Sequence, residues 1–195
     1  MLLSDRDICG RTNWSAGDHR RLVIDPFVSY KVREPGKLSW GLEPTGYTIR
    51  LGSEFQLITA GIGCDFIDPE DWHTYSVRDA TTQMDGSYYI LPGKSVLACS
   101  LERIEMPADV SALLGGKSTL ARLGLSLNTT LLEAGWKGII TIEIFNSGAY
   151  PILLRPGMAI GQLKFEQAMS MPLTSYRGSY QDAAGAQGPR VVEEG

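Results

Sequence analysis

"KGIITIEIFNSG", residues 137–148, is the clearest strand signal in this chain of 195 residues. Side chains along a strand point alternately to its two faces, so the isoleucines at every second position share one face. A face made only of isoleucine belongs in a hydrophobic core. Thr141 and Glu143 lie on the opposite face, between Ile139 and Phe145. The pattern predicts a strand with one buried face and one face available for chemistry.

Other short segments repeat this pattern along the chain. "YTIRLGSEFQLI" (residues 47–58) predicts one strand, and "PILLRPGMAIGQLKFEQ" (151–167) predicts two strands joined at a Pro-Gly turn. Residues 124–136, "GLSLNTTLLEAGW", predict a hairpin, whereas residues 30–46 predict a loop because they are rich in Pro, Gly and charge. A short helix is expected after Ser4, a good N-cap. We therefore expect an all-β fold, mainly β with short helices, built as a sandwich or barrel.

Size and charge limit the domain organisation and the partners. We expect one domain over residues 1–168, followed by a flexible tail over residues 169–195, which are rich in small and polar types. Such a tail is either inert or a lid that orders on a ligand. The net charge of −4 argues against a nucleic-acid partner or an anionic membrane surface. No apolar run approaches the ~20 residues of a membrane span.

Cysteine and histidine usage points to a reducing compartment without zinc chemistry. The three cysteines are widely spaced, which is typical of free thiols, so we expect a cytoplasmic protein. The two histidines, His19 and His73, have no partner at metal-ligand spacing, and no C-x-x-C occurs. A zinc site is therefore not expected.

Glu143 is the first candidate for chemistry. Its position on the outer face of the strand leaves two environments open: an open solvated face, or a partly apolar pocket. The second environment prepares a carboxylate to accept and return protons. Glu133 and Trp136 lie just before this strand, in "LLEAGW". They form either a wall for a nucleoside or a surface turn whose Trp covers the edge of the core.

The stretch "LLGGKSTLARLGL", residues 113–125, is the second candidate. It is not a P-loop, because Ser111 stands where that motif needs its first Gly and only about one helical turn can follow. Paired glycines, hydroxyls and the charges of Lys117 and Arg122 still suit a polyanion. The alternative is an ordinary tight turn with solvated charges.

Taken together, these segments resemble the dCTP deaminases, members of the trimeric dUTPase superfamily. The resemblance runs nearly end to end, through "MLLSDRDI", "LVIDP", "GYTIRLG", "LERIEMPAD" and "GKSTLARLGL". It is densest in "EAGWKGIITIEIFNSGAYPILLRPGMAIGQLKFE", and the tail carries "SYQ" and "QGP". The resemblance implies a β-rich, jelly-roll-like or barrel-like subunit that forms a homotrimer, with active sites between subunits.

The resemblance also implies roles for the candidates. "GKSTLAR" is similar to the family segment R-S-S-L-A-R, which holds a deoxynucleotide triphosphate with its Mg²⁺. That similarity assigns Lys117, Ser118, Thr119 and Arg122 to the phosphates, and Ser118 also to the attacking water. Glu143 falls on the catalytic glutamate, which takes a proton from water attacking C4 of cytosine and passes protons to N3 and the leaving ammonia, without zinc.

Several positions depart from the family pattern. Lys117 replaces an Arg, Thr48 stands where Asp is common, and Glu133 replaces an Asp that approaches the sugar 3′-hydroxyl. The base-reading hairpin is about two residues shorter, so its threonine is either Thr129 or Thr130. In the tail, the candidates for closure over the triphosphate are Tyr180, Gln181 and Gln187, with Arg190 adding charge.

The expected function is hydrolytic deamination of dCTP to dUTP and ammonia for thymidylate synthesis. Alternatives are a bifunctional enzyme that continues to dUMP, a plain dUTPase, and a regulator that senses dNTPs on the same fold. dUTPases carry an apolar residue at the position of Glu143, which favours deamination. Inhibition by dTTP is a further possibility that the family suggests.

Overall fold

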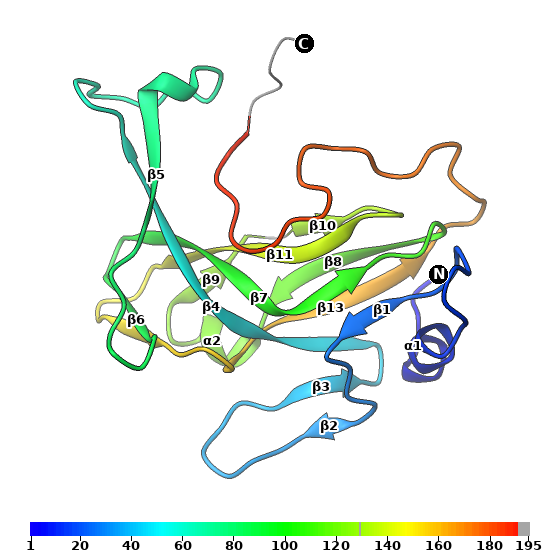
Figure 1. Cartoon of the computed structure of the whole chain (residues 1–195). Coiled ribbons are helices and arrows are strands. Elements are labelled where there is room, and N and C mark those ends of the chain that lie inside the picture. Colours follow the sequence, from blue (N-terminus) through cyan, green and yellow to red (C-terminus); the bar gives the residue numbers. More distant parts are fainter. Residues whose placement is uncertain (129, 191–195) are drawn as a thin grey trace.

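The computed structural model describes residues 1–128 and 130–190 as a mainly β subunit with a curled antiparallel sheet, which confirms the expected fold class (Figure 1). The helices and strands are α1 (Asp5–Thr12), β1 (Val23–Asp25), β2 (Lys31–Val32), β3 (Trp40–Glu43), β4 (Gly46–Ala60), the 3-10 helix η1 (Trp72–Thr74), β5 (Tyr75–Asp79), β6 (Tyr88–Ile90), β7 (Ser95–Glu105), β8 (Val110–Gly116), α2 (Ser118–Ala121), β9 (Leu125–Leu127), β10 (Thr130–Leu132), β11 (Lys137–Asn146), β12 (Ile152–Leu154) and β13 (Ala159–Gln167).

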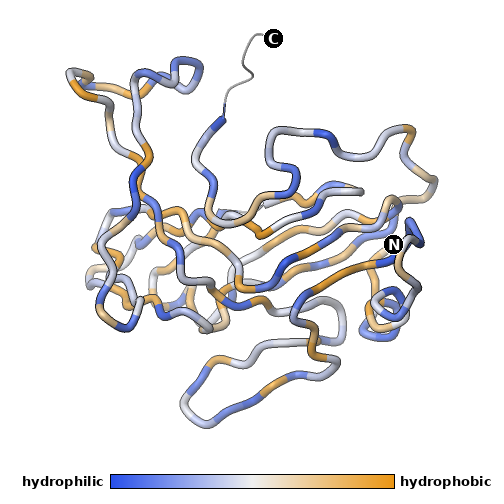
Figure 2. Tube along the Cα trace, in the orientation of Figure 1, coloured by the Kyte–Doolittle hydropathy of each residue, from blue (hydrophilic) through white to orange (hydrophobic). Residues whose placement is uncertain are grey.

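Within the described residues, eleven strands form one sheet whose main path runs β10-β8-β13-β4-β7-β11-β9. Strands β1, β2, β3 and β5 branch from that path, and β6 pairs with β12 separately. Figure 1 shows β4 and β5 rising together from the body as an arm, with the β2–β3 hairpin on the opposite side. Figure 2 shows apolar stretches on the strands of the body and further apolar residues at the far end of that arm.

The strand expected from the alternation in residues 137–148 forms as predicted. Strand β11 buries its isoleucine face completely, with Ile140, Ile142 and Ile144 at most 1% exposed. It pairs with β7 along most of its length, but β9 pairs with it only from Ile144 to Asn146. The first half of β11 therefore has an edge that another segment can occupy.

The register between β7 and β11 shifts between Ile139 and Thr141. Ser100 compensates for the irregularity: its hydroxyl accepts a hydrogen bond from the amide of Ile140 (2.9 Å) and donates to the carbonyl of Glu102 (2.7 Å). A buried amide that the ladder leaves unpaired would otherwise cost the free energy of a lost hydrogen bond. The polar side chain of Ser100 thus belongs to the sheet.

Glu102 secures the other side of β7. Its fully buried carboxylate accepts hydrogen bonds from the amide and the Nε of Arg50, both at 2.8 Å. Arg50 also stacks over the Trp40 ring at 3.7 Å, which ties the β2–β3 hairpin to the body. Burial raises the pKa of Glu102, against the opposing hydrogen bonds and charge of Arg50.

Two local expectations were wrong. Residues 124–136 do not form a hairpin, because β9 pairs with β11 while β10 pairs with β8. Residues 30–46 are not all loop, since they contain β2 and β3. Thr48, one of the departures from the family pattern, is fully buried and donates to Glu43 across the β3–β4 turn (3.2 Å). Helix α1 does begin after Ser4, with a complete capping box.

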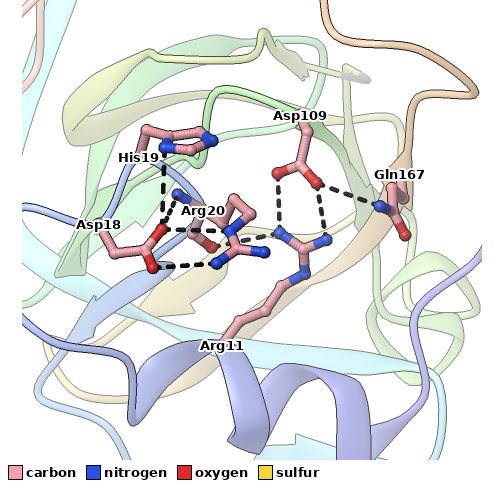
Figure 3. A network of polar contacts seen from close by, with 6 residues as sticks. All are labelled: Arg11, Asp18, His19, Arg20, Asp109 and Gln167. Atoms are coloured by element: carbon pink, nitrogen blue, oxygen red, sulfur yellow. Dashed lines mark hydrogen bonds and ion pairs between the residues drawn. The ribbon is translucent and has the colours of Figure 1, made fainter.

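Helix α1 is held to the sheet by a buried ion pair (Figure 3). Arg11 donates to both carboxylate oxygens of Asp109 at 2.7 and 2.8 Å, and Gln167 donates to the same carboxylate at 3.1 Å. Both charged side chains are less than a tenth exposed. Burial acts to raise the pKa of Asp109, but the hydrogen bonds and charge of Arg11 outweigh it and hold the pKa below 3.8.

We predict that Asp109→Asn lowers the free energy of unfolding by ~3 kcal/mol at neutral pH, because it leaves the buried Arg11 charge without its counterion. A carboxyl group whose pKa is lower in the folded state stabilises that state at pH values above its unfolded pKa. It loses this contribution as the pH falls through its folded pKa. The difference between wild type and variant, measured by urea titration, should therefore shrink below pH 3.8. Asp18→Asn, at an exposed pair with Arg20, is the control and should change little.

Candidate active site

Glu143 borders a cavity of ≈ 410 Å³ on the outer face of β11. Strand β10 supplies one wall, and residues of the C-terminal segment supply another. The walls are largely apolar; Leu97, the register partner of Glu143 on β7, is one of them. Of the two environments that the sequence left open for Glu143, the structure therefore shows the partly apolar pocket.

Few polar groups face Glu143 across this cavity. The hydroxyl of Thr130 donates to Glu143 Oε2 at 3.4 Å, and the hydroxyl of Thr141 lies two residues away on the same face of β11. Thr129, the other candidate threonine, lies outside the described residues. Within residues 1–128 and 130–190, the half-buried Glu143 carboxylate has this one weak hydrogen-bond partner, which leaves lone pairs for a ligand or a water molecule.

Trp136 joins the cavity wall to the C-terminal segment. The ring is only 6% exposed, and its Nε1 donates to the carbonyl of Tyr180 (3.0 Å). Both polar atoms of the Gln181 side chain are hydrogen-bonded. Its Oε1 accepts from the amide of Lys137, and its Nε2 donates to the carbonyl of Gly135, each at 3.1 Å. Tyr180 itself lines the cavity.

The C-terminal segment then follows the free edge of β11. Ile139 donates its amide to the carbonyl of Ala183 at 2.8 Å, and Gln187 donates its amide to the Thr141 hydroxyl at 3.0 Å. Gln187 lines the cavity, and its side-chain oxygen accepts from Arg190. Within the described part of the predicted tail, residues between 176 and 189 thus contribute to the cavity wall. Figure 1 shows this run of chain above β10 and β11.

The expected phosphate group lies apart from this cavity. β8 ends at Gly116, and the single turn of α2 carries Ser118 and Thr119 into solvent, with Arg122 also exposed. Lys117 is half-buried and donates to the carbonyl of Ser39 (3.1 Å). Burial lowers the pKa of Lys117, while the charge of Glu43 opposes that change. None of the four residues lines the cavity of Glu143 in this chain.

Glu133 is also separate from Glu143. It is exposed and lines a second, open cavity that contains Arg177 and Ser111. Leu131 and Tyr176 border both cavities. One chain therefore brings Glu143 together with Thr130, Trp136, Tyr180 and Gln187. Gln181 borders a different cavity, and neither Glu133 nor the expected phosphate residues lie beside Glu143.

Tyr176 is a cavity residue that was not predicted from the sequence. Its amide donates to the carbonyl of Ala134 (3.0 Å), which places the ring between the cavity of Glu143 and that of Glu133. An aromatic residue inside an otherwise small and polar tail was the available signal. Ser39 was not predicted either; its carbonyl, in the β2–β3 hairpin, accepts the hydrogen bond from Lys117.

The described residues contain no group of three or more His, Cys, Asp or Glu side chains placed to hold a metal ion. No helix within residues 1–128 and 130–190 has the length and apolarity that crossing a membrane requires.

Comparison with known proteins identifies the family. The model of the dCTP deaminase-like family matches residues 11–168. The dCTP deaminase of Campylobacter fetus is 38% identical over 175 residues, covering 88% of this chain and 91% of the relative. The dCTP deaminase of Helicobacter hepaticus is 34% identical over 185 residues, covering 92% and 96%.

A solved structure shares the fold. The 2′-deoxycytidine 5′-triphosphate deaminase of Agrobacterium tumefaciens superposes with a TM-score of 0.55 at 20% identity. The match covers 86% of this chain and 48% of that longer chain. At this identity the likeness supports the fold alone.

We predict that ending the chain at Arg177 exposes Trp136 to water, because the truncation removes Tyr180 and Gln181. The Trp136 contribution to fluorescence should shift to longer wavelength and become more sensitive to iodide quenching. The same truncation in a Trp136→Phe background is the control, and it should leave the spectrum of the other three tryptophans nearly unchanged. Equal quenching of the full and truncated chains would contradict the packing described for this segment.

Proposed function

The chain belongs to the dCTP deaminase-like family, and on that premise we propose that it hydrolyses dCTP to dUTP and ammonia. Water adds to C4 of the cytosine, and the 4-amino group leaves as ammonia. Deamination in this form supplies dUTP as a precursor for thymidylate. The proposal is supported above all by one observation: Glu143 projects from β11 into a largely apolar cavity that is open to a ligand.

Glu143 is the proton carrier in this proposal. Its carboxylate takes a proton from the attacking water and gives it to N3. It then takes the proton of the new C4 hydroxyl and gives it to the amine, which leaves as ammonia while C4 becomes a carbonyl. Each of these two cycles returns the side chain to the carboxylate, so one group serves the whole reaction. The apolar walls strengthen the electrostatic effect of that charge on the developing transition state. Thr130 holds one oxygen and leaves the other for the water.

The triphosphate is assigned to Lys117, Ser118, Thr119 and Arg122, with Mg²⁺ arriving on the nucleotide. Ser118 also helps to position the water. Because these residues lie away from the cavity of Glu143, we propose a homotrimer in which one subunit supplies Glu143 and its neighbour supplies the phosphate group. Glu133 approaches the sugar, and the tail of residues 169–195 closes over the nucleotide through Tyr180, Gln181 and Gln187. We propose a cytoplasmic site of action.

We predict that Glu143→Gln lowers the rate of ammonia release from dCTP by roughly 10³-fold or more, because glutamine cannot carry a proton. Binding of dCTP with Mg²⁺, measured by calorimetry, should be retained within about threefold, since the change removes charge but little volume. Wild-type chain should yield dUTP and ammonia from dCTP with zinc chelated.

The same assay separates the alternatives. Formation of dUMP from dCTP without free dUTP would indicate a bifunctional enzyme, and turnover of dUTP alone would indicate a dUTPase. Binding without turnover would indicate a dNTP sensor, and dTTP added as a competitor tests inhibition. Full activity of Glu143→Gln would show that another group carries the proton.

We further predict complementation between two inactive variants. Glu143→Gln and Arg122→Ala damage different halves of a shared site, so refolding an equal mixture should assemble some sites with both groups intact. Random assembly gives about a quarter of the wild-type activity, because each half is intact with a probability of about one half. The separately refolded variants are the control. A mixture no more active than its components would contradict a site shared between subunits.

A further inference from the structure

The pairing of β4 with β7 is irregular beside the C-terminal segment. Its register shifts between Leu51 and Phe55, so the intervening residues leave the regular ladder. Glu54 lies in this bulge, and the residue as a whole is exposed to solvent. Bulges re-aim side chains and are frequent beside active sites. Here the bulge directs the carboxylate toward the C-terminal segment, 132 residues later in the chain.

The carboxylate of Glu54 meets the backbone of that segment. Its Oε2 accepts a hydrogen bond from the amide of Ala186 at 3.1 Å. Gly185 packs directly against the same carboxylate, and a Cβ at this position would overlap it. Ala183 and Ala186 are 7% and 5% exposed, so this short stretch is seated on the body of the protein. A charged acceptor makes such a bond stronger than a neutral one.

The next residue is held by a different strand. Gln187 donates its amide to the Thr141 hydroxyl on β11 (3.0 Å), two positions from Glu143. Consecutive amides of the segment are thus fixed to β4 and to β11. Gln187 lines the cavity that Glu143 borders, so the two attachments determine where its side chain stands.

We propose that Glu54 is a positioning residue that holds Ala186, and through it Gln187, over the cavity of Glu143. It acts through the tail and touches no substrate. The kinetic part of this proposal rests on the proposed dCTP deamination. Loss of the carboxylate should weaken closure on the bound nucleotide, so KM should rise while kcat changes less.

Hydrogen exchange of the full chain without nucleotide tests the attachment directly. In Glu54→Ala, the amides of Ala186 and Gln187 should exchange roughly tenfold faster, the factor expected for losing one charge-assisted hydrogen bond. Glu54→Gln keeps an acceptor oxygen and should restore most of the protection. Protection in Glu54→Ala equal to wild type would overturn the proposal. Glu34→Ala, at an exposed pair with Lys37, is the control.

Gly185→Ala provides an independent perturbation. Its φ angle is not in the left-handed region, so the added methyl group acts by displacing the Glu54 carboxylate. Its effect on exchange should match that of Glu54→Ala, and the double variant should be no worse than either single change, because both remove one contact. Gly10→Ala, where a Cβ meets open space, is the matched control. Additive effects of Glu54→Ala and Gly185→Ala would contradict a shared contact.

Kinetics then separate positioning from general stability. With dCTP as substrate, Glu54→Ala should raise KM roughly tenfold with kcat within about twofold, and Glu54→Gln should restore KM. Faster exchange with unchanged KM would overturn the positioning role. The exchange experiment needs no turnover, so the attachment can be established even if the chain fails to deaminate dCTP, which would defeat the proposed function alone.

Discussion

The rest of the structure depends on the two-faced character of β11. Its isoleucine face fixes the strand in the core, and a slip of one residue would expose those isoleucines and bury Glu143. The large apolar burial on one face therefore determines where a single carboxylate stands on the other. The short partner β9 leaves the first half of β11 with an open edge. The C-terminal segment uses that edge, so the same strand presents the acid and receives the tail.

Strand β7 shows how the sheet accommodates this arrangement. It has register shifts against both β4 and β11, and two of its buried polar side chains bond backbone amides of these neighbouring strands. Ser100 serves the amide of Ile140, and Glu102 serves the amide of Arg50. Because the side chains of Ser100 and Glu102 are hydrogen-bonded to these amides, burying them costs little free energy, and the bonds favour one register of the strands. The bulge on β4 in turn gives Glu54 its direction. Irregularity in the centre of the sheet thus sets the geometry at its surface.

The sequence predicted the elements whose signals are local. The alternation in β11, the N-cap at Ser4 and the single turn of α2 depend on near neighbours in the chain, and they form as expected. The expected hairpin over residues 124–136 failed because strand partners are chosen by distant segments. Strand β9 pairs with β11 and strand β10 pairs with β8, so the two strands do not pair with each other. Composition also could not show that Tyr176 stands between two cavities or that Lys117 reaches Ser39, since both contacts come from tertiary packing.

The separation of the two candidate groups has a physical logic. A carboxylate that carries protons works best beside apolar walls with few competing hydrogen bonds, and β11 provides such a site. A triphosphate instead needs exposed donors and cations that can meet a strongly hydrated polyanion, and the turn of α2 provides those. Placing both within one small cavity would bring cationic side chains against Glu143 and draw it into ion pairs, which favour its charged form and weaken it as a base. In the homotrimer that we propose, a site divided between subunits would keep the two environments distinct until the nucleotide spans them. The C-terminal segment, held from β4 and β11, would then close the side of the cavity that the strands leave open.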